Sequence, residues 1–229
     1  MPGQAIRPAQ AANAPALSMT EHMFGITEHM TSQAAPSTAQ AILDSTLSIV
    51  GERGLEAVTH RAVAEHAGVS LGAISHYHPS RDDLLREALR RTAAVAVERL
   101  ERLALDMQSR PFDTDEWVEG MAGAVTDDLR RNRVGQLAQY ELLLAAARDP
   151  ELREISRPWR EAHLRVAVAG MRAAGSRSPE LHASLLVAAA TGLMLKQLAF
   201  PDRSFGRREL AAAVSELVKA LTSSEEGAA

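Results

Sequence analysis

Side chains that form hydrogen bonds to anions and to base edges gather between residues 59 and 81 of this 229-residue chain. They are Thr59, His60, Arg61, Ser70, Ser75, His76, Tyr77 and Arg81. Hydroxyl, imidazole and guanidinium groups bind phosphate oxygens, and an arginine also pairs with guanine O6 and N7 through two donors. The chemistry available here is recognition by hydrogen bonding.

Groups suited to bond making are scarce. The chain has no cysteine, which excludes a disulfide, a thiolate metal site and a cysteine nucleophile. Its sequence has no Gly-rich phosphate loop, no paired metal-ligand motif on a helix and no nucleophile elbow. Glu141 beside Tyr140, and His163 close to Glu161, are better explained as solvent-facing or pairing groups. We expect no enzymatic activity, no cofactor and no metal.

The composition favours an all-α fold. Alanine dominates the apolar residues, whereas aromatic residues make up 3% of the chain, and this balance favours helices over strands. The net charge of −4 is no signature of nucleic-acid binding, so DNA recognition must depend on local geometry. Without an apolar run of about 18 residues or a signal peptide, we expect a cytoplasmic protein with no membrane contact.

Cap residues before periodic apolar segments, with Gly or Pro after them, predict nine helices from residue 37 onward. Three are short and six are longer. Their approximate ranges are 37–52, 59–68, 70–77, 80–107, 113–130, 133–147, 150–174, 179–199 and 206–222. Residues 1–35 are rich in Ala, Pro, Gln, Ser and Thr, which predicts a disordered arm, and residues 223–229 are expected to be a flexible tail.

The spacing of Ala64, Gly68 and Ile74 indicates a helix-turn-helix. Two helices that cross steeply over a three-residue turn need a small side chain at their contact, here Ala64. They also need a residue that tolerates positive φ where the first helix ends, here Gly68. Val63, Val69 and Ile74 then face inward. An αα-hairpin inside a helical bundle would satisfy the same steric demands and remains the alternative.

The run from Ile74 to Leu85, ISHYHPSRDDLL, resembles the exit of the recognition helix in the tetracycline-repressor (TetR) family of transcriptional regulators. The resemblance is specific over residues 40–90 and extends in architecture to residue 222. It implies a three-helix DNA-binding head (36–82) on a six-helix body for effector binding and dimerisation (83–222). Ser75 and His78 stand where the family usually has aromatic residues, so we expect a more polar junction between head and body.

The resemblance implies that the third helix enters the major groove of double-stranded DNA. Arg61 is the predicted base reader, and the cap residues Thr59 and Ser70 are predicted to bind phosphates. The remaining predicted DNA contacts are His60, Leu71, Gly72, Ala73, Ser75, His76, Tyr77 and Arg81. Leu71, Gly72 and Ala73 offer only close backbone approach and contact with thymine methyl groups. Acids outnumber arginines between residues 37 and 92, so affinity requires a locally basic face and two heads.

The body is predicted to form a homodimer and to hold a small-molecule effector. Segment 181–199 is apolar on nearly every side, which suits a helix covered by its own core and by a partner. The central helix of a monomeric bundle is the alternative. The predicted lining of an effector site is Trp117, Met121, Tyr140, Leu144, Trp159, His163 and Met194. Core packing explains each of these residues equally well.

Together these features predict a sequence-specific DNA-binding transcriptional regulator. The resemblance implies a repressor that an unidentified, largely apolar effector releases from a palindromic operator. The effector would favour a body conformation in which the long helix from Ser80 swings and changes the spacing of the heads. The rival hypothesis is a helical protein–protein adaptor that binds no DNA. It explains the apolar segment 181–199 but not the pattern at 59–81.

Overall fold

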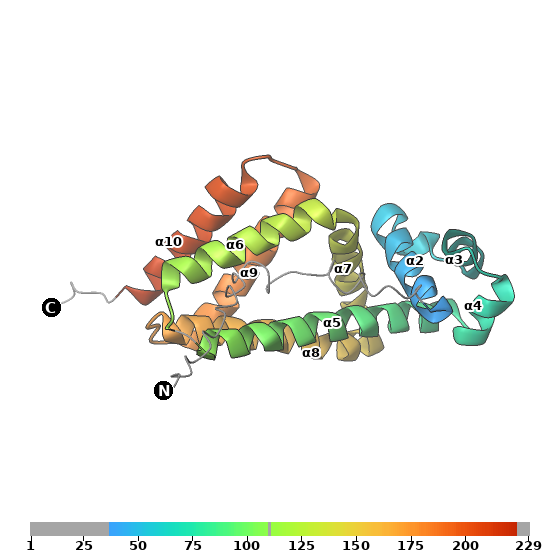
Figure 1. Ribbon diagram of the computed structural model, residues 1–229, viewed down its shortest axis with the longest axis horizontal. Helices are drawn as coiled ribbons and strands as arrows, with labels where there is room; N and C mark the ends of the chain where they lie inside the picture. The colour runs from blue at the N-terminus through green and yellow to red at the C-terminus, as the bar shows by residue number, and fades with distance from the viewer. Residues whose placement is uncertain (1–36, 110, 224–229) are drawn as a thin grey trace, which may run out of the picture.

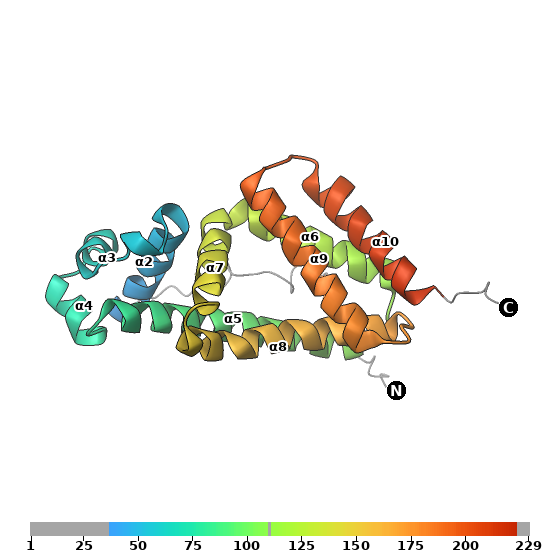
Figure 2. The same ribbon diagram turned by 180° about the vertical axis from the view of Figure 1, so that it is seen from behind.

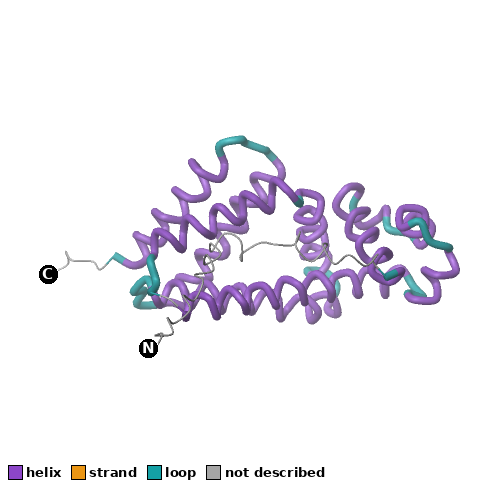
Figure 3. Tube along the Cα trace, viewed as in Figure 1, coloured by secondary structure: helices purple, strands orange, loops and turns teal. Residues whose placement is uncertain are grey.

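The computed structural model describes residues 37–109 and 111–223, so the predicted arm (1–35) and nearly all of the predicted tail lie outside the described residues. Over these ranges the secondary structure is helical throughout (Figure 3), as the composition predicts. The elements are α2 (Thr38–Arg53), η2 (Leu55–Ala57), α3 (His60–Ala67), α4 (Leu71–Tyr77), α5 (Arg81–Ser109), α6 (Thr114–Arg131), α7 (Arg133–Ala146), α8 (Pro150–Ala173), α9 (Pro179–Ala199), η3 (Phe205–Leu210) and α10 (Ala211–Thr222).

Capping hydrogen bonds set the start of α3 and α4. The Oγ1 of Thr59 accepts from the backbone N–H of Ala62 at 3.1 Å, and the Oγ of Ser70 accepts from the N–H of Ala73 at 3.1 Å. Between these two helices, Gly68 adopts a left-handed conformation with φ of 67°, which a residue without a Cβ adopts at little cost. The tight turn predicted from the glycine is confirmed.

The predicted side-chain caps are present at the starts of α5, α6 and α8 but not of α9. Ser80 and Asp83 form a reciprocal pair before α5, and Asp113 and Asp149 accept backbone N–H groups at the starts of α6 and α8. Ser178 makes no side-chain cap at the start of α9. Its own backbone N–H donates to the Oγ of Ser176 instead, so the proline at the first helical position marks this start without a side-chain cap.

The molecule is elongated, and α5 runs along its length (Figures 1 and 2). The helices α2, α3 and α4 lie at one end of α5 and form the head, while α6, α9 and α10 lie toward the other end. The helix α8 runs beside α5, and α7 stands between the head and the rest of the body. This layout places the head beside both α5 and α7.

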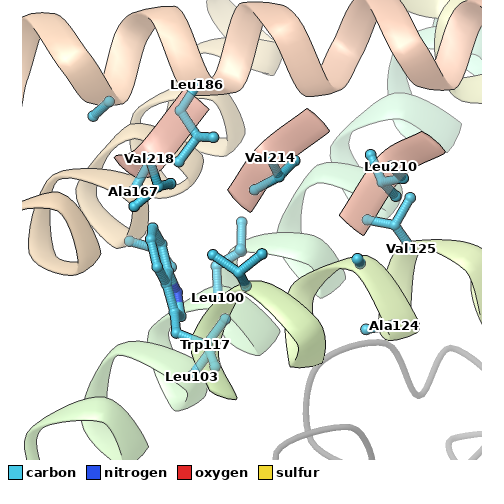
Figure 4. Packing of buried hydrophobic residues seen from close by; sticks show 14 of the residues in the cluster. Leu100, Leu103, Trp117, Ala124, Val125, Ala167, Leu186, Leu210, Val214 and Val218 are labelled. Atoms are coloured by element: carbon cyan, nitrogen blue, oxygen red, sulfur yellow. The ribbon is translucent and has the colours of Figure 1, made fainter. Parts of the chain in front are cut away.

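Two hydrophobic cores hold the head and the body. Ile42, Ile49, Val63, Ile74 and Leu84 are fully buried in the head core, which confirms that Val63 and Ile74 face inward. In the body core, side chains from α5, α6, α8, α9, η3 and α10 pack together (Figure 4). The head core also includes Ala138 and Leu142 of α7, so α7 contributes apolar surface to the head.

Helix α9 has two apolar faces. Ala183, Leu186 and Leu198 are buried in the body core, whereas Leu181, Leu185 and Leu195 are exposed. Among the described residues, α9 is also the helix whose length and hydropathy would allow it to cross a membrane. Core helices of soluble proteins have the same length and composition, so this property does not assign α9 to a membrane.

The head touches α7 through a backbone contact at Gly51 of α2. A Cβ added at Gly51 would lie 2.0 Å from the carbonyl oxygen of Val134, in the first turn of α7. Such a separation is far inside van der Waals contact, and the backbone atom cannot rotate away as a side chain would. The absence of a side chain at Gly51 therefore sets the distance between head and body.

We expect Gly51→Ala to lower the free energy of unfolding by about 1–3 kcal/mol, because α2 and α7 must separate to admit the methyl group. Gly72→Ala is the matched control, since a Cβ there meets only Ser70 Oγ at 3.9 Å. The control should be neutral or stabilising by about 0.5–1 kcal/mol, because alanine favours helix. Urea unfolding followed by circular dichroism measures both, and equal stability of Gly51→Ala and wild type would contradict the close contact.

Candidate functional site

The head presents most of the predicted DNA-contacting residues on its surface. Exposed among them are Thr59, Arg61, Ser70, Leu71, Gly72, Ser75, His76 and Tyr77. His60, Ala73 and Arg81 are partly buried. Leu71 begins α4 with 52% of its surface exposed, although leucine is more often buried. The face formed by the start of α3 and by α4 therefore exposes polar and apolar groups together.

Arg61 is an exposed cation in the first turn of α3, and within the described residues it takes part in no ion pair. Three arginines of α5 are engaged elsewhere. Arg86 and Arg90 pair with Glu151 of α8, and Arg91 pairs with Asp44 of α2. Acids thus pair with these α5 arginines, whereas Arg61 and Arg53 stay exposed as candidates for the locally basic face that the sequence analysis requires.

Arg81 binds the protein itself. Its Nε donates to the carbonyl of Val58 at 3.0 Å, and one Nη donates to the carbonyl of Leu55 at 2.7 Å. Its guanidinium group also lies 3.7 Å from the carboxylate of Glu56. These bonds tie η2 to the start of α5, and a phosphate contact by Arg81 stays a prediction that would compete with them.

His78 is buried where α4 meets α5, at a position where the family usually has phenylalanine. Burial lowers its pKa, while the nearby carboxylate of Glu87 acts in the opposite direction and His60 adds to the lowering. The Nε2 of His60 is itself buried without a hydrogen-bond partner in the described part of the chain. The junction contains two imidazoles and a carboxylate where an aromatic ring would otherwise pack.

In the body, the predicted effector-lining residues differ in how deeply they are buried. Trp117 is 2% exposed, and its ring lies against Gly170 of α8, where a Cβ would approach within 2.2 Å. Met121, Tyr140, Trp159 and Met194 are partly buried and pack against the body core. Leu144 is 60% exposed on α7, so it does not face this interior and is left out of the lining.

Polar contacts accompany this aromatic interior. The hydroxyl of Tyr140 lies 3.4 Å from the carbonyl of Thr191 on α9, and burial raises the pKa of Tyr140 to about 12. The imidazole Nδ1 of His163 lies 3.1 Å from the carbonyl of Trp159, with the two rings edge to face at 5.1 Å. Burial lowers the pKa of His163 despite that contact, which favours the neutral ring.

Sequence reasoning missed a buried acid and a buried amide where α6 meets α7. Asp128 of α6 and Gln136 of α7 are each 4% exposed, and the Nε2 of Gln136 donates to the carboxylate of Asp128. Burial raises the pKa of Asp128 to about 6, although Arg99 and hydrogen bonds from Gln136 and Asn132 oppose the rise. The Oε1 of Gln136 has no hydrogen-bond partner among the described residues.

The helical spacing could have revealed this acid. Trp117, Met121 and Asp128 lie four and seven residues apart, which places them on one face of α6. A carboxylate in line with buried apolar residues is unusual.

No group of three or more His, Asp or Glu residues in the described ranges is arranged to hold a metal ion.

Comparison with known proteins places the chain in a family. Residues 42–88 match the family model described as bacterial regulatory proteins of the tetR family, and residues 112–220 match the model described as the tetracyclin repressor-like C-terminal domain. The two matches cover the head and most of the body, which are the two parts of a helix-turn-helix regulator. The chain belongs to the TetR family, as the residues around Gly68 and Tyr77 suggest.

Curated relatives match over part of the chain. The HTH-type transcriptional repressor KstR of Mycolicibacterium smegmatis is 42% identical over 74 residues, which cover 32% of this chain and 36% of the relative. KstR of Mycobacterium tuberculosis is 34% identical over 101 residues, 44% of each chain. The chain spans about a third of the length of the first curated relatives that it matches.

Solved structures match over most of the chain. A member of the TetR family from Streptomyces coelicolor A3 is 28% identical with a TM-score of 0.63, covering 82% of this chain and 100% of that one. The multidrug binding protein EbrR, complexed with ethidium, is 27% identical with a TM-score of 0.60 over the same shares. The all-α fold with a helix-turn-helix head is thereby confirmed.

We expect Asp128→Asn to stabilise the protein at neutral pH. The pKa of Asp128 in the folded chain, about 6, lies above the ordinary value of 3.8, so the folded state binds this proton more tightly than the unfolded state. The contribution of Asp128 to the free energy of unfolding should therefore be highest below pH 3.8 and fall as the pH rises to about 6. At higher pH, where the wild-type carboxylate is ionised, Asp128→Asn should raise the free energy of unfolding by about 3 kcal/mol.

Thermal unfolding of the wild type and Asp128→Asn across this pH range measures the effect. The difference in melting temperature should be large above pH 6 and shrink as the solution is acidified. Asp127→Asn is the control, since Asp127 pairs with Arg130 and Arg131 on the surface. An Asp128→Asn variant that is less stable than the wild type at neutral pH would show that the carboxylate is stabilising.

Proposed function

We propose that the protein is a DNA-binding transcriptional regulator that represses its target genes and releases its operator when it binds a small, largely apolar effector. The observation that carries this proposal is the exposed face of α3 and α4, in a segment that matches the regulatory-protein model of the TetR family. The curated relatives are named as transcriptional repressors or regulators. They support a regulator rather than an enzyme, and we propose that it acts in the cytoplasm.

The proposed interface places α4 in the major groove. Arg61 binds a guanine through O6 and N7, and the exposed Leu71 contacts thymine methyl groups. Gly72 allows close approach of the backbone, because a side chain there would meet only open space and the Oγ of Ser70. Thr59, Ser70, His76 and Tyr77 surround this centre and bind the phosphates on either side.

Two heads are needed because one head carries little positive charge. With most nearby arginines paired to acids, a single head releases few counterions from DNA. A two-fold dimer doubles the contacts and implies a palindromic operator with half-sites about one helical turn apart, or a multiple of it. We therefore expect binding to the operator to be strongly dependent on dimerisation.

The exposed face of α9 is the proposed dimer interface, together with α8. Its exposed residues follow helical spacing and comprise Leu181, Leu185, Ala188, Gly192 and Leu195. A monomer seldom leaves a contiguous apolar stripe of this kind in water. The small residues in its centre allow two copies of α9 to approach closely.

The effector is proposed to bind among the aromatic residues of the body. Structural support comes from EbrR, whose solved structure contains ethidium, and from the partly buried Met121, Tyr140, Trp159 and Met194. Binding would favour a body conformation that moves α5 and α7, and with them the head. The competing adaptor hypothesis leaves the exposed Arg61 and Leu71 without a role.

We expect Arg61→Ala to weaken operator binding by about 10-fold to 100-fold, the loss associated with one bidentate guanine contact. A mobility-shift assay with the DNA flanking the gene measures it, and footprinting should show a palindromic site. Arg130→Ala is the matched control, because Arg130 is an exposed body arginine paired with Asp127. Sequence-blind binding, equal for wild type and Arg61→Ala, would favour the adaptor hypothesis.

We expect Leu185→Glu to convert a dimer into a monomer, since it places a charge in the middle of the proposed apolar interface. Sedimentation velocity at micromolar concentration measures the mass. Leu105→Glu serves as control, because Leu105 is as exposed as the α9 leucines but lies on α5. A wild type that sediments as a monomer, or a Leu185→Glu variant that stays dimeric, would place the interface elsewhere.

A further inference from the structure

We infer that Asp128 and Gln136 form the polar end of the effector site and accept hydrogen bonds from an N–H or O–H donor on an otherwise apolar ligand. This inference rests on the proposed function, because it names the chemistry of the ligand that the regulator would sense. Its starting point is the Oε1 of Gln136, which is buried and has no hydrogen-bond partner among the described residues. A buried acceptor of this kind usually has one.

Asp128 and Gln136 lie on the same helix faces as several of the predicted effector-lining residues. Asp128 follows Trp117 and Met121 on one face of α6, and Tyr140 follows Gln136 by four residues on α7. The hydrogen bond from Gln136 to Asp128 joins these two helices directly. A ligand packed against the aromatic side chains would therefore meet this pair at one end.

The surroundings select a donor. Arg99 of α5 already supplies positive charge near Asp128, and the amide of Gln136 already donates to its carboxylate. The unmet hydrogen-bonding capacity of this pair is the amide oxygen, which can only accept. A ligand carboxylate or ketone would present a second acceptor to it, whereas a hydroxyl, an amine or a ring N–H would complete the pair.

Retention of this pair costs stability. A core that keeps a buried carboxylate and an unpaired amide oxygen is less stable than one with apolar residues of similar volume. Departures of this kind from the rules of core packing concentrate at functional sites. A ligand that supplies the missing hydrogen-bond donor offsets this cost when it binds. The ligand-bound body is therefore stabilised relative to the ligand-free body.

Three flat tricyclic compounds test the inference in the full-length protein without DNA. Acridine, above the pKa of its ring nitrogen, only accepts hydrogen bonds; acridone is uncharged and has a ring N–H; proflavin is a cation with two amino groups. Fluorescence titration should give dissociation constants about tenfold lower for acridone and proflavin than for acridine. In Gln136→Met, the preference for both donor-bearing compounds should disappear.

Two further variants separate hydrogen bonding from charge. Asp128→Asn keeps the shape of the side chain and should weaken the binding of proflavin more than that of acridone. If Gln136→Met does not fold, this variant still tests the inference. Asp127→Asn, the neighbouring surface acid, should leave all three constants unchanged. Equal affinity for the three compounds, no binding by any of them, or a preference that survives both Gln136→Met and Asp128→Asn would overturn the inference.

Operator binding distinguishes this failure from failure of the proposed function. A protein that binds its operator but shows no preference for donor-bearing compounds would still be a regulator, with a different effector chemistry. A protein that shows the preference but binds no specific DNA would keep the ligand site and lose the regulator hypothesis. The titrations contain no DNA, so the two results are independent.

Discussion

The long helix α5 belongs to both hydrophobic cores, and the rest of the structure depends on this constraint. Near its start, Leu84, Leu85 and Leu89 are buried in the head core, and further along Leu100 and Leu103 are buried in the body core. A continuous helix between two packed cores transmits rotation and translation, because its backbone hydrogen bonds resist bending. The head therefore cannot change its position without a change in the body.

A second connection runs through α7. Its first turn touches the backbone of α2 at Gly51, and two residues after that contact Gln136 bonds to Asp128 of α6. Gln136 of the polar pair and the contact with the head thus lie within one turn of α7. A ligand that alters the pair acts on a segment that already touches the head, which is the physical coupling that an effector-controlled regulator requires.

Interactions between distant residues are what the sequence analysis could not foresee. Arg81 lies close to the predicted DNA face but bonds the carbonyls of Val58 and Leu55. Arg86 and Arg91 find acids on other helices. Leu144 follows the apolar pattern of α7 yet points to solvent. A local sequence pattern predicts which side chains a helix presents, but it does not predict which side chains of other helices contact them.

Interactions between residues close in the chain made the helices and the helix-turn-helix predictable from the sequence alone. Thr59, Ser70 and Asp113 cap the backbone three residues ahead, and Gly68 needs only its own left-handed conformation, so the information for each lies within a few residues. The tertiary structure alone decided the pairing of the arginines, the exposure of one α9 face and the burial of Asp128 beside Gln136. These depend on contacts between helices far apart in the chain, whose relative placement is set by packing of the whole core rather than by any local signal.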